Sequence, residues 1–163
     1  MNIVELFASN KLSTLEIVSF SELMKKKQKH SNKLFSAVFE ISEDCIILPN
    51  RLEEGMKLKE AEIIKQSKEL GLKLLRRLTY GSKWKLSSNY KYFSFVFDLR
   101  TNWKEIIRNV LKKLKDSPAI LLNGDILIND EIMGNYGTYS DNLNTTVEFY
   151  LKIIDLGIEE VKL

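Results

Sequence analysis

The chain has 163 residues, of which 44% are hydrophobic and 29% are charged, and its net charge at pH 7 is +3. These values are ordinary for a globular protein, and no apolar run approaches the roughly 18–20 residues of a membrane-spanning helix. One cysteine excludes an internal disulfide, and with a single histidine a zinc site built from Cys and His is not expected. We expect one domain over residues 1–163, located in the cytoplasm.

The first half of the chain alternates between extended and helical patterns. Leu15–Phe20 contains β-branched residues typical of extended structure, and lysines at the end of Ser21–Lys29 favour a helix there. Leu34–Ile41 is aromatic and β-branched, which predicts a buried strand. Helices are then expected over about Leu52–Leu70 and, as a second piece, over Leu72–Leu78.

The second half carries the strongest local signals. Tyr92–Leu99 predicts a strand, and apolar residues at i, i+3, i+4 and i+7 predict a helix over Trp103–Lys115. Asn123-Gly124 separates two short apolar runs and is the preferred pair for a type I′ hairpin turn, because both positions need positive φ. A loop over Gly134–Asn144 and a final helix over Thr145–Leu156 complete the expected order.

This order of elements resembles the thioredoxin fold over roughly residues 15–156. Pro118 precedes the hairpin where that family has a proline, usually in cis, and Ser42 and Cys45 occupy the places of its two active-site cysteines. The resemblance implies an α/β three-layer sandwich with a central mixed sheet flanked by helices, redox-inactive because serine replaces the first cysteine. Residues 1–13 would then be an N-terminal extension, and residues 70–91 an enlarged basic and aromatic connection. An unrelated α+β single domain is the alternative.

The residues offer no catalytic set. Glu43 and Asp44 precede Cys45 and disfavour its thiolate, so we expect a poorly reactive thiol there. No cofactor is expected, and a non-enzyme is favoured. Turns accumulate Asp for local backbone reasons, so we assign no metal to the acidic residues of the expected turns. These residues are Asp125, Asp130, Glu131 and Asp141.

Charge is segregated along the chain. Residues 70–115 hold 12 basic and two acidic side chains, whereas residues 116–163 hold two basic and nine acidic ones. Within residues 73–92, cations and aromatic rings alternate without an acid, a pattern that suits phosphates and stacked bases but also suits packed rings with solvated neighbours. The candidate binding residues are Lys73, Arg76, Arg77, Lys83, Trp84, Lys85, Tyr90 and Lys91.

Two functional hypotheses follow. The first is a redox-inactive, thioredoxin-like adaptor that binds a protein partner through residues 70–91. The alternative is a nucleic-acid-binding protein that uses residues 73–92. The sequence leaves the partner and the oligomeric state open.

Overall fold

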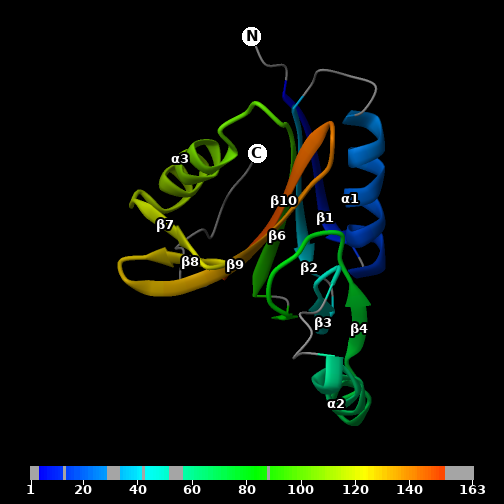
Figure 1. Ribbon diagram of the computed structural model, residues 1–163. Helices are drawn as coiled ribbons and strands as arrows, with labels where there is room; N and C mark the ends of the chain where they lie inside the picture. The colour runs from blue at the N-terminus through cyan, green and yellow to red at the C-terminus, as the bar shows by residue number, and fades with distance from the viewer. Residues whose placement is uncertain are drawn as a thin grey trace.

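The structure of the protein is a computed structural model (Figure 1). Within the residues that it describes, the chain forms a seven-stranded sheet, a three-stranded sheet and three helices. Ser42, one of the two residues aligned with the thioredoxin cysteines, lies outside the described part. The described residues are 4–12, 14–28, 34–41, 43–51, 57–87 and 89–152.

The large sheet has the strand order β1-β2-β6-β10-β9-β8-β7. The first two strands pair in parallel, and every later neighbour in this order pairs antiparallel. Residues 4–12, expected within an N-terminal extension, therefore form an edge strand of the sheet. The bounds are β1 Val4–Leu12, β2 Leu34–Ile41, β6 Tyr90–Asp98, β7 Ala119–Leu122, β8 Asp125–Ile128, β9 Glu131–Ser140 and β10 Asn144–Lys152.

The small sheet has the order β4-β3-β5. Strand β3 (Cys45–Leu48) pairs in parallel with β4 (Lys73–Arg76) and antiparallel with β5 (Trp84–Leu86). The helix α2 (Lys57–Glu69) lies between β3 and β4 in the chain, as a parallel pair requires a crossover. The expected enlarged connection thus supplies two of the three strands of this sheet.

The large sheet buries both of its faces against different elements. Helix α3 (Trp103–Lys115) packs on one face through Ile107 and Leu111, and we call this the α3 face. Helix α1 (Thr14–Gln28) and the small sheet cover part of the opposite face, which we call the α1 face. Figure 1 shows α3 and α1 on opposite sides of β6 and β10. Successive side chains of a strand point to opposite faces, so each central strand contributes to two cores.

Several sequence predictions are confirmed. The helix over Trp103–Lys115 and the strand over Leu34–Ile41 have the predicted bounds. The hairpin of β7 and β8 also forms, and Asn123 and Gly124 have φ values of 51° and 90°, as a type I′ turn requires.

The thioredoxin-like sandwich is wrong, because the chain forms a mostly antiparallel seven-stranded sheet and a strand stands where its last helix was expected. The Ser117–Pro118 bond is not cis, since the described residues contain no cis peptide bond. The predicted loop over Gly134–Asn144 is mostly strand β9, and the predicted helix after it is strand β10. The β-branched run Thr145–Val147 favours a strand, and tertiary pairing with β6 and β9 outweighs the apparent helical spacing.

Three earlier predictions also need correction. Leu15–Phe20 lies in helix α1 rather than in a strand, and the Ser21–Lys29 prediction found only the second half of that helix. The second helical piece expected over Leu72–Leu78 is strand β4 with a following loop. Among the described residues, no helix is both long enough and apolar enough to cross a membrane.

Candidate ligand-binding site on the α1 face

The segment of residues 77–83 folds over the α1 face of the large sheet. The Arg77 amide donates to the Leu48 carbonyl at 2.9 Å, and the Tyr80 amide donates to the Thr138 carbonyl of β9 at 2.9 Å. Gly137 lets this segment approach β9 closely. A Cβ atom on Gly137 would lie 2.3 Å from the Tyr80 carbonyl oxygen, closer than real Cβ contacts allow.

This approach buries Arg77, whose exposed fraction is 2%. Its guanidinium carbon lies 3.4 Å from the centroid of the Trp84 ring, and its Nη2 donates to the carbonyl oxygens of Tyr80 and Ser82 at 3.0 and 2.9 Å. Burial lowers the pKa of Arg77 to about 10, although the nearby carboxylate of Glu148 acts in the opposite direction. The side chain stays charged at neutral pH, so the site holds a buried cation.

Glu148 on β10 supplies the opposite charge and is fully buried. Its Oε2 accepts a hydrogen bond of 2.7 Å from the Thr79 hydroxyl. Burial raises the pKa of Tyr92 well above its ordinary value, and the Glu148 charge raises it further. The phenol of Tyr92 therefore remains neutral at pH 7.

Unpaired polar atoms gather on this face. Within the described part of the chain, eight buried side-chain nitrogen and oxygen atoms have no hydrogen-bond partner. Buried polar atoms are nearly always paired, so such a group calls for a ligand or ordered water. The atoms belong to the segment 77–84 and to residues of β6 and β10 that point to the α1 face. They are Arg77 Nε and Nη1, Trp84 Nε1, Tyr92 Oη, Asn144 Nδ2 and Oδ1, Thr146 Oγ1 and Glu148 Oε1.

A pocket of about 100 Å³ opens beside this group. Tyr150 links the two, because it lines the pocket and its ring packs edge-on against Trp84 with centroids 5.0 Å apart. The Tyr150 hydroxyl donates to Asn135 Oδ1, and Asn135 Nδ2 donates to Asp125. Burial is the main cause that raises the pKa of Tyr150 to about 12. The pocket is lined by Tyr90, Ile132, Met133, Gly134, Asn135, Tyr150 and Lys152.

Apolar side chains extend outward from the pocket. Ile132, which lines it, is cross-strand from Leu127, and Leu127 is cross-strand from Ile120. Ile120 and Ile132 are more than half exposed, at 54% and 64%. Two inter-strand steps make this row about 10 Å long, since neighbouring strands lie about 4.8 Å apart. We call Ile120, Leu127 and Ile132 the apolar row.

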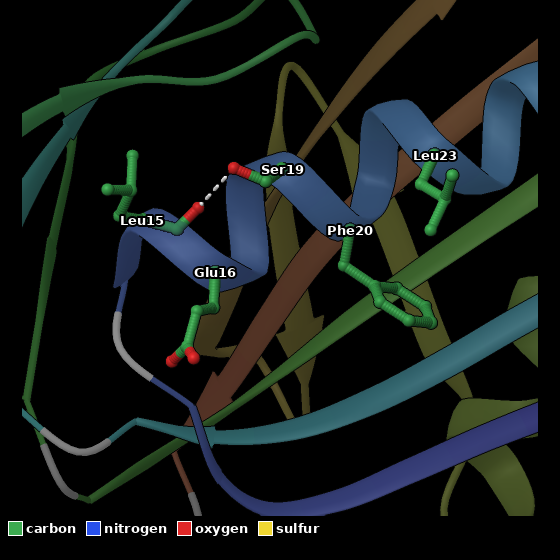
Figure 2. Close-up of a pocket in the computed structure, with 5 residues that line it drawn as sticks. All are labelled: Leu15, Glu16, Ser19, Phe20 and Leu23. Atoms are coloured by element: carbon green, nitrogen blue, oxygen red, sulfur yellow. Dashed lines mark hydrogen bonds between the residues drawn. The ribbon is translucent and has the colours of Figure 1, made fainter.

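A larger hollow of about 450 Å³ lies along α1, but its chemistry is different (Figure 2). Figure 2 shows its lining residues on successive turns of this helix, where the Ser19 hydroxyl donates to the Leu15 carbonyl at 2.8 Å. None of the buried unpaired atoms belongs to its lining, so we assign the functional site to the smaller pocket. The hollow is lined by Leu15, Glu16, Ser19, Phe20 and Leu23.

The fold brings some of the binding residues predicted from the sequence to the site and leaves the others in ion pairs or at the surface. Arg77 and Trp84 lie in the buried group, and Tyr90 lines the pocket. Lys73 is paired with Glu43 at 2.7 Å. Arg76 is paired with Glu60 and also donates to the Pro49 carbonyl, while Lys83, Lys85 and Lys91 keep contact with solvent.

The thioredoxin-motif residues lie apart from the site. Cys45 is fully buried in the core of the α1 face, and Pro118 is exposed just before β7. Sequence reasoning missed Glu148, because the segment around it was read as a helix. The alternation of Thr146, Glu148 and Tyr150 along a strand would have been the signal. Among the described residues, no group of three or more His, Cys, Asp or Glu side chains could hold a metal ion.

Comparison with solved structures finds this architecture elsewhere. A structure of lipoate-protein ligase A bound with ATP matches with a TM-score of 0.71 and 14% identity, over 93% of this chain and 67% of that one. The fold is that of the lipoate-protein ligases. P. falciparum LipL1 in complex with lipoate matches with a TM-score of 0.73 and 15% identity, over 98% of this chain and 53% of that one.

An archaeal lipoylation system from Thermoplasma acidophilum gives a third match. Its title names a bi-partite lipoate protein ligase and an E2 lipoyl domain, and the match has a TM-score of 0.72 and 12% identity over 93% of this chain. The chain spans between 53% and 67% of the length of these three structures. No protein-family profile matches the sequence, and a search of curated proteins gives no match.

These matches overturn the first functional hypothesis. The structures that share the fold are lipoate-protein ligases, so the thioredoxin-like, non-catalytic adaptor is wrong. The nucleic-acid alternative finds no support among these matches. The burial of Arg77 and Trp84 also removes two of its proposed contacts from the surface.

Proposed function

We propose that this chain binds a lipoate-type acyl ligand on its α1 face and takes part in attaching lipoyl groups to protein. The observation that carries the proposal is the group of unpaired buried polar atoms beside the pocket of Tyr150, in a fold shared with lipoate-protein ligases. Small-molecule sites are typically concave and mostly apolar, with a few convergent polar groups. The pocket, the apolar row and the buried group have this composition.

In this proposal, the two ends of the ligand lie in different places. The carbon chain packs along the apolar row, where burying methylene groups contributes about 0.8 kcal/mol each. The polar head enters the pocket and reaches past Tyr150 toward Arg77 and Trp84, whose N–H groups lack acceptors. A pocket of about 100 Å³ holds only the head, so the chain of the ligand lies over the sheet.

A protein partner belongs to the same proposal. The Thermoplasma structure joins a ligase of two parts with a lipoyl domain, and this chain spans 62% of the matched chain in that structure. We propose that a lipoyl domain approaches the uncovered part of the α1 face, over β7, β8 and β9. The ligand would then be reached from solvent through the pocket mouth at Ile132, which is 64% exposed.

Tryptophan fluorescence tests ligand binding, because the two tryptophans report on different faces. Trp84 packs against Tyr150 on the α1 face, whereas Trp103 lies beside Tyr136 on the α3 face, with ring centroids 6.1 Å apart. Trp103→Phe leaves Trp84 as the only tryptophan, and its emission should change saturably on titration with lipoate. Trp84→Phe leaves only Trp103, and its emission should stay constant.

A transfer assay tests the second half of the proposal. The protein is mixed with lipoate, MgATP and an unmodified lipoyl domain, and the acceptor mass is followed by mass spectrometry. A gain of one lipoyl group, absent when the protein is omitted, is expected. The proposed function is rejected if lipoate neither changes Trp84 emission nor shifts the melting temperature, and no acyl transfer occurs.

A further inference from the structure

Helix α3 carries a row of cations on its exposed side. Lys104, Arg108 and Lys112 are exposed and follow one another at intervals of four residues. Residues at this spacing are neighbours on a helix surface, so the three side chains start from a line about 12 Å long. We call these three residues the basic stripe. Part of the positive charge that the sequence gathers in residues 70–115 is thus displayed on one surface.

The basic stripe is not neutralised by the rest of the described chain. Among the described residues, none of its three cations forms an ion pair, whereas Lys25, Lys73 and Arg76 are each paired with a carboxylate. The acidic C-terminal part of the chain does not change this. Its Asp141 pairs with Lys25 of α1, which lies on the opposite side of the sheet from α3 (Figure 1). The stripe therefore presents its charge to solvent.

These charges do not help the helix to form. Like charges four residues apart repel each other, and a cation in the first turn opposes the helix dipole. Lys104 lies in that first turn. The helix is held instead by its apolar side, which packs on the sheet through Ile107 and Leu111. Because proteins keep locally unfavourable features mainly at functional sites, the basic stripe calls for a partner of opposite charge.

Resting on the proposed function, we infer that the basic stripe docks an acidic face of the protein that accepts the lipoyl group. Helix α3 leads through residues 116–118 into β7, and the helix and the strand are in contact (Figure 1). Strand β7 is an edge of the large sheet, and its Ile120 begins the apolar row that leads to the pocket. A domain of about 100 residues has a radius of gyration of about 13 Å, so one domain at the β7 edge reaches both the stripe and the apolar row.

An acidic protein fits the stripe better than a nucleic acid does. Proteins that bind single strands stack the bases on aromatic rings, and the one aromatic residue of α3, Trp103, is half-buried beside Tyr136. Complementary charge across a protein interface mainly speeds the encounter and selects the partner. The basic stripe therefore guides the acceptor to the β7 edge, and the pocket on the α1 face holds the ligand.

Charge reversal on α3 tests the docking, and a matched reversal on α2 is the control. The stripe variant carries Lys104→Glu and Lys112→Glu, and the control carries Lys59→Glu and Lys68→Glu, which are exposed on α2 at the other end of the molecule (Figure 1). Biolayer interferometry measures binding of an unmodified lipoyl domain whose net charge is negative at pH 7. The stripe variant should bind it about tenfold more weakly, mainly through slower association, and the control should change less than about twofold. Added salt should weaken binding to the unmodified protein, and lipoate affinity should be equal in all three proteins.

The outcomes separate the two proposals. If the stripe variant and the control bind the lipoyl domain equally, or if the domain does not bind while lipoate does, the docking inference is overturned and lipoate binding stands. If neither the domain nor lipoate binds, both proposals are overturned. Mixed-sequence RNA or phosphatidylglycerol vesicles that bind the stripe more tightly than the domain would show recognition of phosphate and overturn the inference.

A milder variant covers the case in which the double reversal does not fold. Arg108→Gln removes the central charge of the stripe and leaves the apolar side of α3 unchanged. It should weaken binding of the lipoyl domain about threefold, as expected for one exposed ion pair. Unchanged affinity in a folded Arg108→Gln variant would overturn the inference.

Discussion

The two faces of the large sheet are built from the same strands and differ in nearly every other respect. On β6 and β10, most of the residues that point to the α3 face are aromatic or aliphatic, and Phe149 stacks against Phe93 and Phe95 with centroids 4.7 and 5.8 Å apart. The alternate residues point to the α1 face and include Glu148, Thr146 and other polar side chains. Eight unpaired polar atoms among the described residues lie on the α1 face.

The difference teaches which face serves stability and which serves binding. Leaving a buried polar group without a partner costs roughly 1–3 kcal/mol, so the polar α1 face contributes less to stability than an apolar face of the same area. The α3 face offsets this cost with close apolar packing over α3. Natural proteins depart from the rules of good packing mainly at functional sites. Because successive side chains of a strand point to opposite faces, this sheet keeps the stabilising apolar core on the α3 face and the polar binding site on the α1 face.

The largest effect should come from Phe149→Ala on the α3 face. Removing a fully buried ring that is stacked on two others should lower the free energy of unfolding by about 3–5 kcal/mol. Urea denaturation measures this directly. A loss below about 1 kcal/mol would mean that the α3 face is not the main stabilising core.

The α3 face was also the part that the sequence predicted well. Helix α3 shows a regular apolar spacing and ends where predicted, and the Asn-Gly turn fixes the hairpin that packs beside it. These signals are local, so a single sequence carries them. The error at β10 arose because Val147, Phe149, Tyr150 and Leu151 also fit a helical spacing, and because every residue from Asn144 to Leu151 is buried, including the polar ones that alternate with them.

The α1 face could not be predicted in the same way. The acid-free stretch of residues 73–92 drew attention to the right segment, but as an exposed basic surface. Burial of Arg77 depends on Gly137 and on Glu148, which are 60 and 71 positions away in the sequence. No local pattern shows that a particular arginine will meet a glycine and a carboxylate across a sheet.

Gly137→Ala should break the contact between the 77–83 segment and β9. The added methyl group would overlap the Tyr80 carbonyl oxygen and would lie 2.7 Å from Thr79 Oγ1, so the segment must move. Such overpacking costs about 1–3 kcal/mol and should also abolish binding of the lipoyl ligand. Thr138→Ala, at the next residue of β9, is the control and should retain binding. Unchanged stability and affinity in Gly137→Ala would show that the segment is not held as described.

Thr79→Val compares the two faces through matched hydroxyl groups. It removes the donor to Glu148 and should cost about 1–3 kcal/mol of stability, because a buried carboxylate loses its partner. Thr145 hydrogen-bonds the neutral hydroxyl of Ser140 at 2.9 Å, so Thr145→Val should cost less, about 1 kcal/mol. If thermal or urea unfolding shows that both variants lose the same free energy of unfolding, the hydrogen bond from Thr79 to Glu148 contributes no more than the one between Thr145 and Ser140.

Tyr150→Phe tests the pocket with a smaller change. The variant loses the hydroxyl that donates to Asn135 but keeps the ring against Trp84. We expect lipoyl-ligand affinity to fall about fivefold, equivalent to roughly 1 kcal/mol for one neutral hydrogen bond. Tyr136→Phe removes a hydroxyl from a tyrosine of β9 that packs on the α3 face, and it should leave affinity unchanged. Equal effects of the two variants would place the ligand elsewhere.

The smallest expected effect concerns the ion pair where α1 meets the β9–β10 turn. Lys25 Nζ lies 3.1 Å from Asp141 Oδ2, and the Asp141 carboxylate accepts from the Leu143 and Asn144 amides. Burial acts to raise the pKa of Asp141, but these two amide bonds and Lys25 outweigh it and lower the pKa below its ordinary value. A carboxyl whose pKa is lowered by folding stabilises the protein above its unfolded pKa of about 3.9, and this contribution is lost as pH falls through the folded value.

Asp141→Asn isolates that charge, because the amide oxygen can still accept from the turn. The pair is partly exposed and screened by solvent, so the variant should lose less than about 1 kcal/mol at pH 7. The difference from the unmodified protein should shrink as pH falls below the unfolded pKa of about 3.9, and it should vanish below the lowered pKa of the folded carboxyl. Urea denaturation at pH 7 and pH 3 measures both values. A difference that persists at pH 3 would assign the stability to the geometry of the turn rather than to its charge.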